Sequence, residues 1–107
     1  MPRILTIRDL RSACERLLDA AESEFGSEID LDSVPTPVAE YWSFDPKTAF
    51  TLAPEPEREA GSVTDDLAEI SEFLQRPKGD VHLWHDLDHL CGLLRLLVFM
   101  DYPEATT

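Results

Sequence analysis

The sequence predicts a mainly α-helical domain with three principal helices and an irregular insertion between the first and the second. Apolar residues recur at three- and four-residue spacing in three segments, which is the periodicity of helices that bury one face. Five of the eight prolines lie between the first two of these segments and interrupt the periodicity there. With 107 residues, of which 43% are hydrophobic, the chain is expected to form a single domain over residues 1–107.

The first helix is expected at about residues 7–25. Thr6 precedes it and Asp9 follows three residues later, an arrangement typical of a helix N-terminus. Gly26 stands where a residue of left-handed conformation commonly ends a helix. The sequence therefore marks both ends of a helix whose apolar stripe is formed by Ile7, Leu10, Cys14, Leu17, Ala21 and Phe25.

Residues 27–61 form the expected insertion. Two segments in it, 40–44 and 48–52, are rich in aromatic and other strand-favouring residues, and the Asp45-Pro46 pair between them suits a turn. We expect these two segments to form a short β-hairpin. The prolines and charges at 54–57 favour an extended connection to the next helix.

The other two helices are expected at about residues 63–75 and 81–100, the second of them with Asp80 as its N-cap. The helix at 81–100 is apolar around much of its circumference. It is therefore expected to be either the central element of the core or half of a homodimer interface. The predicted buried stripes are Val63, Leu67, Ile70 and Leu74 in one helix and Trp84, Leu87, Cys91, Leu94 and Val98 in the other.

The chain carries a net charge of −13, from 22 acidic and 9 basic residues. Such a field repels phosphate backbones and anionic lipid headgroups, so direct binding to nucleic acid or to a membrane is not expected. Residues 27–75 carry twelve acidic and two basic side chains, whereas residues 1–26 carry five and four. The insertion and the second helix are therefore expected to form an acidic surface.

This acidic surface predicts a basic protein partner. Carboxylates steer such a partner and aromatic side chains supply contact area. The leading functional hypothesis is a non-catalytic protein-interaction domain, such as an immunity protein, an antitoxin or an accessory subunit. In the alternative interpretation the charge serves solubility alone and the aromatic residues belong to the core. The expected partner-binding residues are Tyr41, Trp42, Phe44, Glu55, Glu57, Glu59, Asp65 and Asp66.

A histidine-rich segment at the start of the third helix supports a second hypothesis, a metal-binding or metal-dependent protein. His82, His85, Asp86 and His89 would share one face of the helix, and imidazole and carboxylate groups bind zinc and other divalent transition metals. No HExxH or CxxC motif accompanies them, so a further ligand would come from another segment or from water. In the interpretation favoured over a metal site, the histidines are hydrogen-bonded to backbone or to carboxylate groups, and a pH-sensitive contact is a third interpretation.

Enzymatic activity is disfavoured by the absence of recognisable catalytic motifs. No serine lies in a nucleophile elbow, and the four glycines form neither a phosphate-binding loop nor a dinucleotide fingerprint. No apolar segment approaches the roughly 20 residues that span a bilayer, and no signal-peptide core follows Met1. A cytoplasmic protein is therefore expected, in which Cys14 and Cys91 remain reduced.

Two short segments carry a resemblance to other proteins. Residues 40–42 are Glu-Tyr-Trp and residues 60–67 are Ala-Gly-Ser-Val-Thr-Asp-Asp-Leu. This pairing resembles a pattern in small acidic bacterial proteins of uncharacterised function, in which a YW segment precedes a GxLxDDL-like helix start. Val63 replaces the leucine of that pattern. The resemblance covers residue 40 to the third helix and implies kinship of fold, without an activity or a catalytic residue.

Overall fold

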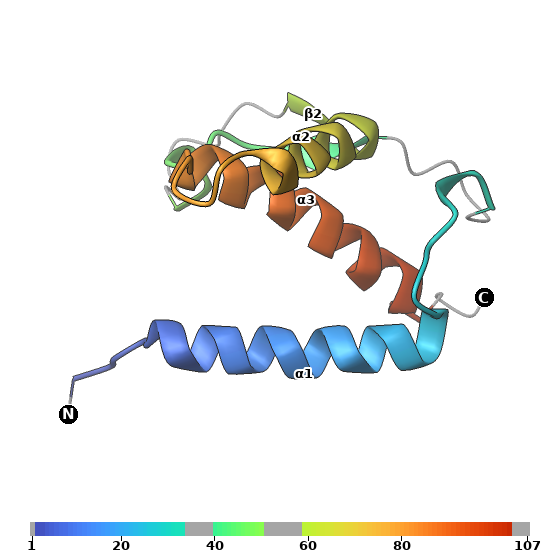
Figure 1. Ribbon diagram of the computed structural model, residues 1–107, viewed down its shortest axis with the longest axis horizontal. Helices are drawn as coiled ribbons and strands as arrows, with labels where there is room; N and C mark the ends of the chain where they lie inside the picture. Colours follow the sequence, from blue (N-terminus) through green and yellow to red (C-terminus); the bar gives the residue numbers. More distant parts are fainter. Residues whose placement is uncertain (1, 34–39, 51–58, 104–107) are drawn as a thin grey trace. The chain divides into compact units, whose positions relative to one another are not determined.

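The computed structural model describes residues 2–33, 40–50 and 59–103. The fold class predicted from the sequence is confirmed, since the chain is mostly helical and a two-stranded antiparallel hairpin lies between its first two α-helices in sequence. The chain divides into two compact units, residues 1–34 and 35–107, so the single domain stays a prediction. The elements in order (Figure 1) are α1 (Ile7–Phe25), the 3-10 helix η1 (Leu31–Ser33), β1 (Glu40–Ser43), the 3-10 helix η2 (Thr48–Phe50), β2 (Glu59–Ser62), α2 (Val63–Gln75) and α3 (Leu83–Asp101).

Helix α1 is the main element of the first unit, and its two predicted ends are confirmed. The hydroxyl of Thr6 accepts a hydrogen bond from the backbone N–H of Asp9 at 3.0 Å. Gly26 has a φ of 88°, which favours glycine, and donates its N–H to the carbonyl of Glu22. No residue of α1 is buried: Leu10 and Leu17 are exposed, and Ala21 and Phe25 are half-buried.

The hairpin of the second unit differs from the predicted one in its second strand. Glu40 pairs with Ser62 and Ser43 with Glu59, so β1 pairs with residues 59–62 and not with residues 48–52. Residues 48–50 instead form η2. The Asp45 carboxylate accepts hydrogen bonds from the backbone N–H groups of Lys47 at 2.9 Å and Thr48 at 3.4 Å, which holds the chain in a turn at the start of η2. The rest of the predicted strand lies outside the described residues.

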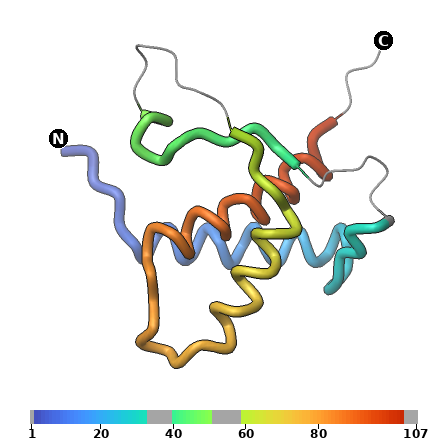
Figure 2. The backbone as a smooth tube through the Cα atoms, turned by 90° about the horizontal axis from the view of Figure 1, so that it is seen from above, coloured from blue at the N-terminus to red at the C-terminus, as the bar shows by residue number. Residues whose placement is uncertain are grey.

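Helix α2 begins directly after β2, with the Ser62 hydroxyl accepting the N–H of Asp65 as its cap. It packs against α3, to which residues 76–82 connect it (Figures 1 and 2). Helix α3 begins at Leu83 with His82 as its N-cap, so the predicted Asp80 cap is wrong. The N–H of Asp80 instead bonds to the carbonyl of Pro77, in a turn that precedes the helix.

The buried face of α3 also differs from the predicted one, because it carries Asp86, Gly92 and Leu96. Val63 and Leu96 are the buried apolar residues of the described chain. Most of the predicted stripe residues are exposed: Trp84, Leu87, Cys91 and Val98 on α3, and Leu67 and Leu74 on α2. Because α3 is apolar on several sides, its apolar pattern alone does not define the inward face. That face carries Asp86, which bonds to Arg76, and His89, which bonds to Asp66. Despite this exposed apolar surface, none of the described helices is long and apolar enough to cross a bilayer.

Candidate functional site

A polar cluster lies in the second unit, where β1, α2 and α3 meet. At its centre is Asp66 of α2, which is 3% exposed. Its Oδ2 accepts a hydrogen bond from the Tyr41 hydroxyl at 2.6 Å, and its Oδ1 lies 2.7 Å from Nδ1 of His89. One carboxylate therefore joins three elements that are far apart in the sequence.

Two glycines make room for this cluster. Gly61 of β2 is the cross-strand partner of Tyr41, and a Cβ there would overlap the tyrosine ring. A Cβ at Gly92 of α3 would overlap both the Asp66 carboxylate and the Tyr41 hydroxyl. A glycine inside a helix lowers helix stability by about 1 kcal/mol relative to alanine. At Gly92 this loss accompanies the close approach of Asp66 and Tyr41 to the helix backbone.

The bonding capacities of the groups fix which atoms carry protons. Burial, followed by the hydrogen bond to Asp66 and its negative charge, raises the pKa of Tyr41 well above its usual value. The Tyr41 hydroxyl thus stays protonated and donates to Asp66. An ionised carboxylate only accepts hydrogen bonds, so the His89 tautomer that satisfies this contact is the one with its proton on Nδ1. In the neutral ring, Nε2 of His89 then holds a free lone pair.

A second cluster shares His89 with the first and consists of Glu69, His85 and His89. One possible ligand atom from each of the three side chains lies within 4.8 Å of the other two, and all three residues are half-buried. Glu69 is one turn beyond Asp66 on α2, and the two histidines are one turn apart on α3. Their rings lie edge to face with centroids 4.6 Å apart. Two imidazoles and a carboxylate are a ligand set that suits a divalent transition metal.

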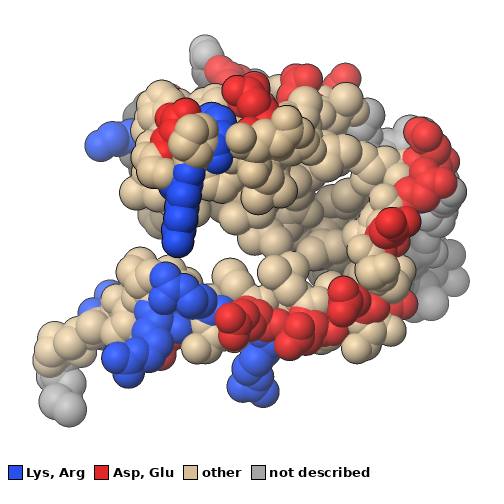
Figure 3. Space-filling model, in the orientation of Figure 1, with Lys and Arg blue, Asp and Glu red and all other residues tan. Residues whose placement is uncertain are grey.

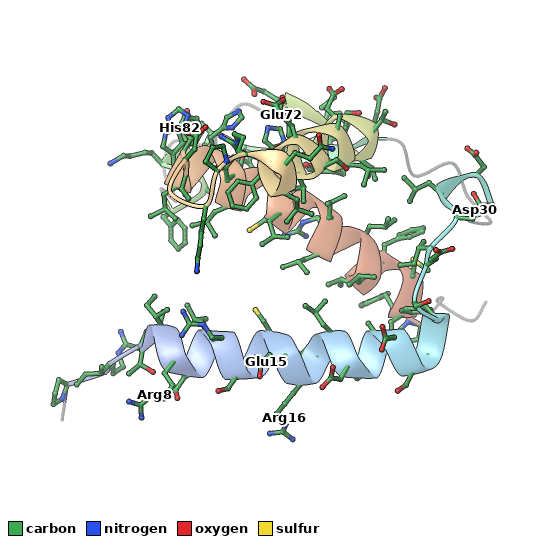
Figure 4. The ribbon with its side chains drawn as sticks, viewed as in Figure 1. Arg8, Glu15, Arg16, Asp30, Glu72 and His82 are labelled. Atoms are coloured by element: carbon green, nitrogen blue, oxygen red, sulfur yellow. The ribbon has the colours of Figure 1, made fainter. Side chains whose placement is uncertain are left out.

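The other two predicted metal ligands, His82 and Asp86, are engaged elsewhere. Asp86 bonds to Nη2 of Arg76 at 2.7 Å and to the backbone N–H of His82 at 2.9 Å. Burial alone would raise the pKa of Asp86, but these two hydrogen bonds outweigh it and lower the pKa. His82 is the N-cap residue of α3, at the start of that helix (Figure 4), so it stands outside the regular helical spacing of His85 and His89. Its ring contacts Trp84 and His85.

The predicted partner-binding residues divide between the surface and the interior. Strand alternation turns Tyr41 and Gly61 to one face of the hairpin and Trp42 and Ala60 to the other. Tyr41 and Asp66 thus belong to the polar cluster, and Asp66 is buried and not part of the acidic surface. Glu55 and Glu57 lie outside the described residues. The exposed members of the set are Trp42, Phe44, Glu59 and Asp65.

Sequence reasoning missed Glu69 and both cluster glycines. A glycine inside an otherwise apolar helix indicates close packing, so Gly92 carried a usable signal. Glu69 stands three residues after Asp66, which places both on one face of α2. Nothing local, however, indicates that this face meets the histidines.

The two segments that carry the sequence resemblance meet in the structure. Tyr41 of the YW segment lies over Gly61, and it bonds to Asp66 of the GxLxDDL-like segment. No protein-family model, curated protein or solved structure matches this chain. The resemblance therefore stays a prediction, and a function has to be inferred from the surfaces and clusters of the chain itself.

Proposed function

We propose that this chain is a non-catalytic protein-interaction domain that binds a basic surface of a partner protein. The observation that supports this most directly is the outward face of the hairpin. Trp42 is 68% exposed there, and its cross-strand neighbour is the small Ala60. Glu40 lies two residues earlier on the same face. An exposed indole beside a carboxylate combines contact area with attraction for a cation.

The charge of the second unit also supports a basic partner. Carboxylates gather along the edge of this unit where α2 and β2 lie (Figure 3). Of its described charged residues, three basic ones are exposed: Lys47, Lys78 and Arg95. This excess of negative charge would attract a basic surface and speed its encounter with the domain. The exposed acidic residues are Glu40, Asp45, Glu59, Asp65, Glu72, Asp80, Asp88 and Asp101.

The proposed activity is to cover or organise the basic surface, as an immunity protein, an antitoxin or an accessory subunit does. The gene neighbourhood distinguishes these versions. An adjacent toxin or nuclease gene favours an inhibitor, whereas an operon for a larger complex favours an accessory subunit. In each case the interaction weakens as salt rises, because exposed charges more than a Debye length apart are screened.

Affinity capture from the native host, followed by binding measurements at two salt concentrations, tests the proposal. Trp42→Ala should weaken capture of the partner strongly, since an exposed indole at the centre of an interface is a typical hot spot. Trp84→Ala is the matched control, because this tryptophan is 60% exposed but lies on α3. Equal effects of the two substitutions would contradict the assignment of the hairpin face.

The electrostatic part has its own matched pair of variants. Glu40→Gln, Glu59→Gln and Asp65→Asn together should lower the association rate and flatten its salt dependence. The control removes three exposed carboxylates from α1, with Glu15→Gln, Asp19→Asn and Glu22→Gln. If the two triple variants lost the same affinity, net charge rather than this surface would be responsible. If neither triple variant changed binding, the acidic residues would serve solubility and not partner binding.

Self-association through α3 is a second proposal, supported by the apolar stripe that this helix leaves exposed. Leu87 and Val98 lie on that stripe, and Phe99 beside it is also exposed. A homodimer would bury these side chains against a second copy. Sedimentation over a range of concentrations should detect the dimer, and Leu87→Glu with Val98→Glu should abolish it. A wild-type monomer at every concentration would remove this proposal.

A further inference from the structure

We propose that Glu69, His85 and His89 bind a divalent transition-metal ion such as Zn²⁺, and that Asp66 positions His89 for this role. The site is independent of the proposed protein-binding surface. It combines one carboxylate from α2 with two imidazoles from α3, so both helices contribute to it. Three protein ligands leave at least one coordination position for water or another small ligand.

The orientation of His89 is the strongest argument for this site. Metal-bound histidines almost always donate their second ring N–H to a carboxylate or carbonyl, which fixes the tautomer and strengthens the ligand. Asp66 makes this contact with Nδ1 of His89 at 2.7 Å, so Nε2 presents its lone pair. Asp66 is itself held by the Tyr41 hydroxyl at 2.6 Å, and Gly92 leaves it the space.

The side chains of Glu69, His85 and His89 bring one possible ligand atom each into a common region, and these atoms must draw closer to bind one ion. Ligand atoms that bind one zinc ion at about 2 Å lie roughly 3–4 Å apart, compared with the 4.8 Å limit that encloses the present atoms. Closing this difference requires a small rotation of the side chains. No hydrogen bond to Asp86 holds the His85 ring in place, because its Nδ1 lies 3.9 Å from that carboxylate, which is beyond hydrogen-bonding distance.

A bound cation would also offset a buried negative charge. Asp66 has hydroxyl and imidazole partners, and the structure gives it no arginine or lysine within its described contacts. Removing a carboxylate from water is costly unless a cation compensates it. A metal ion on Nε2 of His89 would place positive charge one ring away from Asp66. The net charge of −13 favours cation binding in addition.

The direct test is titration of the full chain with Zn²⁺, after tag removal and treatment with a chelator. One ion per chain should bind. His85→Ala, His89→Ala and Glu69→Gln should each weaken binding, by more than the roughly 10- to 100-fold typical for loss of a residue that only positions a ligand. His82→Ala is the matched histidine control: its ring contacts that of His85, but His82 is not one of the three ligands and its side chain makes no capping hydrogen bond. Far-ultraviolet circular dichroism checks that each variant is folded.

These titrations decide the proposal in either direction. One equivalent of Zn²⁺ that the three ligand variants weaken and His82→Ala leaves unchanged supports the site. Failure of the wild-type chain to bind overturns it. So does wild-type affinity in any ligand variant, or an equal loss in His82→Ala, which would indicate adventitious binding to surface histidines.

The positioning role of Asp66 has a separate readout that needs no substitution. Imidazole ¹⁵N chemical shifts of the metal-free wild-type chain should show His89 protonated at Nδ1, whereas protonation at Nε2 alone would overturn the role of Asp66. In a folded Asp66→Asn variant, Zn²⁺ affinity should fall about 10- to 100-fold and the visible spectrum of bound Co²⁺ should change. Asp65→Asn serves as its control, because Asp65 is the exposed neighbour of Asp66 on α2 and its described hydrogen bond involves its backbone N–H and Ser62, not the three ligands.

Discussion

Asp66 and Asp86 are both buried carboxylates of the second unit, with exposures of 3% and 6%, yet their surroundings differ. Asp86 bonds to Arg76 and to the backbone of His82, which lie ten and four residues away in the sequence. Asp66 bonds to Tyr41 and His89, which lie 25 and 23 residues away. Asp86 therefore holds a local turn and the start of α3, whereas Asp66 connects three elements.

The partners of the two carboxylates also differ in charge. The guanidinium of Arg76 is permanently positive and helps to lower the pKa of Asp86 despite its burial. The hydrogen-bond partners described for Asp66 are the Tyr41 hydroxyl and the His89 ring, neither of which carries a permanent charge. A buried carboxylate that is fully paired by arginine has a structural role. One that is paired with histidine retains a capacity to respond to a ligand.

The largest expected effect comes from closing the space around Asp66. Gly92→Ala should destabilise the protein by about 3 kcal/mol, because the added methyl group overlaps Asp66 and Tyr41 and weakens both of their contacts. Urea denaturation measures the loss. Gly79→Ala is the control, because a Cβ there meets nothing within 4 Å. Similar losses in both variants would show that the space at Gly92 does not matter.

The next effect should be confined to the Asp86 region. Asp86→Asn and Arg76→Gln should each lower the melting temperature, and the double variant should lose less than the sum of the two, since both substitutions break one ion pair. Thermal unfolding of the four proteins gives this coupling. Neither variant should change the tautomer of His89, because the ring of His89 bonds to Asp66. A change in either variant would contradict the separation of the two carboxylates.

Local signals in the sequence were sufficient to predict α1 and the pairing of His85 with His89. Thr6 and Gly26 mark the ends of α1 through bonds to residues three or four positions away. The two histidines share a face because helical spacing places residues four apart together. These features depend on contacts within one helical turn, and such contacts can be recognised in a single sequence.

The features that could not be predicted depend on contacts between distant segments. The second strand, Glu-Ala-Gly-Ser, has little strand propensity, and it pairs with β1 where Gly61 accommodates the Tyr41 ring. The inward face of α3 carries polar residues with partners outside the helix, His89 with Asp66 and Asp86 with Arg76, in place of the predicted apolar stripe. Glu69 was missed for the same reason, because the register of α2 against α3 is not encoded in either helix alone.

A smaller loss is expected from Tyr41→Phe, which removes one of the two bonds to Asp66 and keeps the ring over Gly61. The free energy of unfolding should fall by about 1–2 kcal/mol. Tyr102→Phe, at an exposed position, should change it little. No difference between the two variants would contradict the bond to Asp66.

The raised pKa of Tyr41 also predicts how the free energy of unfolding changes at alkaline pH, which Tyr41→Phe can test. Because the pKa of Tyr41 is raised in the folded state, its contribution to stability is complete below the usual tyrosine pKa of 10.0 and is lost as pH rises towards the folded-state value. Above pH 10, wild type should therefore lose stability more steeply than Tyr41→Phe. Absorbance titration should show one of the two tyrosines ionising well after the other. Parallel stability curves would exclude a raised pKa at Tyr41.

The smallest effect on stability is expected from Asp45. This carboxylate is hydrogen-bonded but exposed, so it shows the effect of hydrogen bonding on a carboxyl pKa in the absence of burial. The backbone N–H groups of Lys47 and Thr48 lower its pKa below 3.8 without a buried cation. Its contribution is therefore present above pH 3.8 and is lost as pH falls through the lower folded-state value. Carboxyl-carbon NMR should give a titration midpoint below 3.8 for Asp45 in both wild type and Arg76→Gln.

In Arg76→Gln the titration midpoint of Asp86 should rise. Burial raises the pKa of this carboxyl group, and in the variant the His82 N–H opposes that effect without the help of the guanidinium. An unchanged Asp86 midpoint would mean that backbone N–H groups alone keep the pKa of a buried carboxyl group low. The difference between Asp86 and Asp66 would then not depend on the charge of their partners.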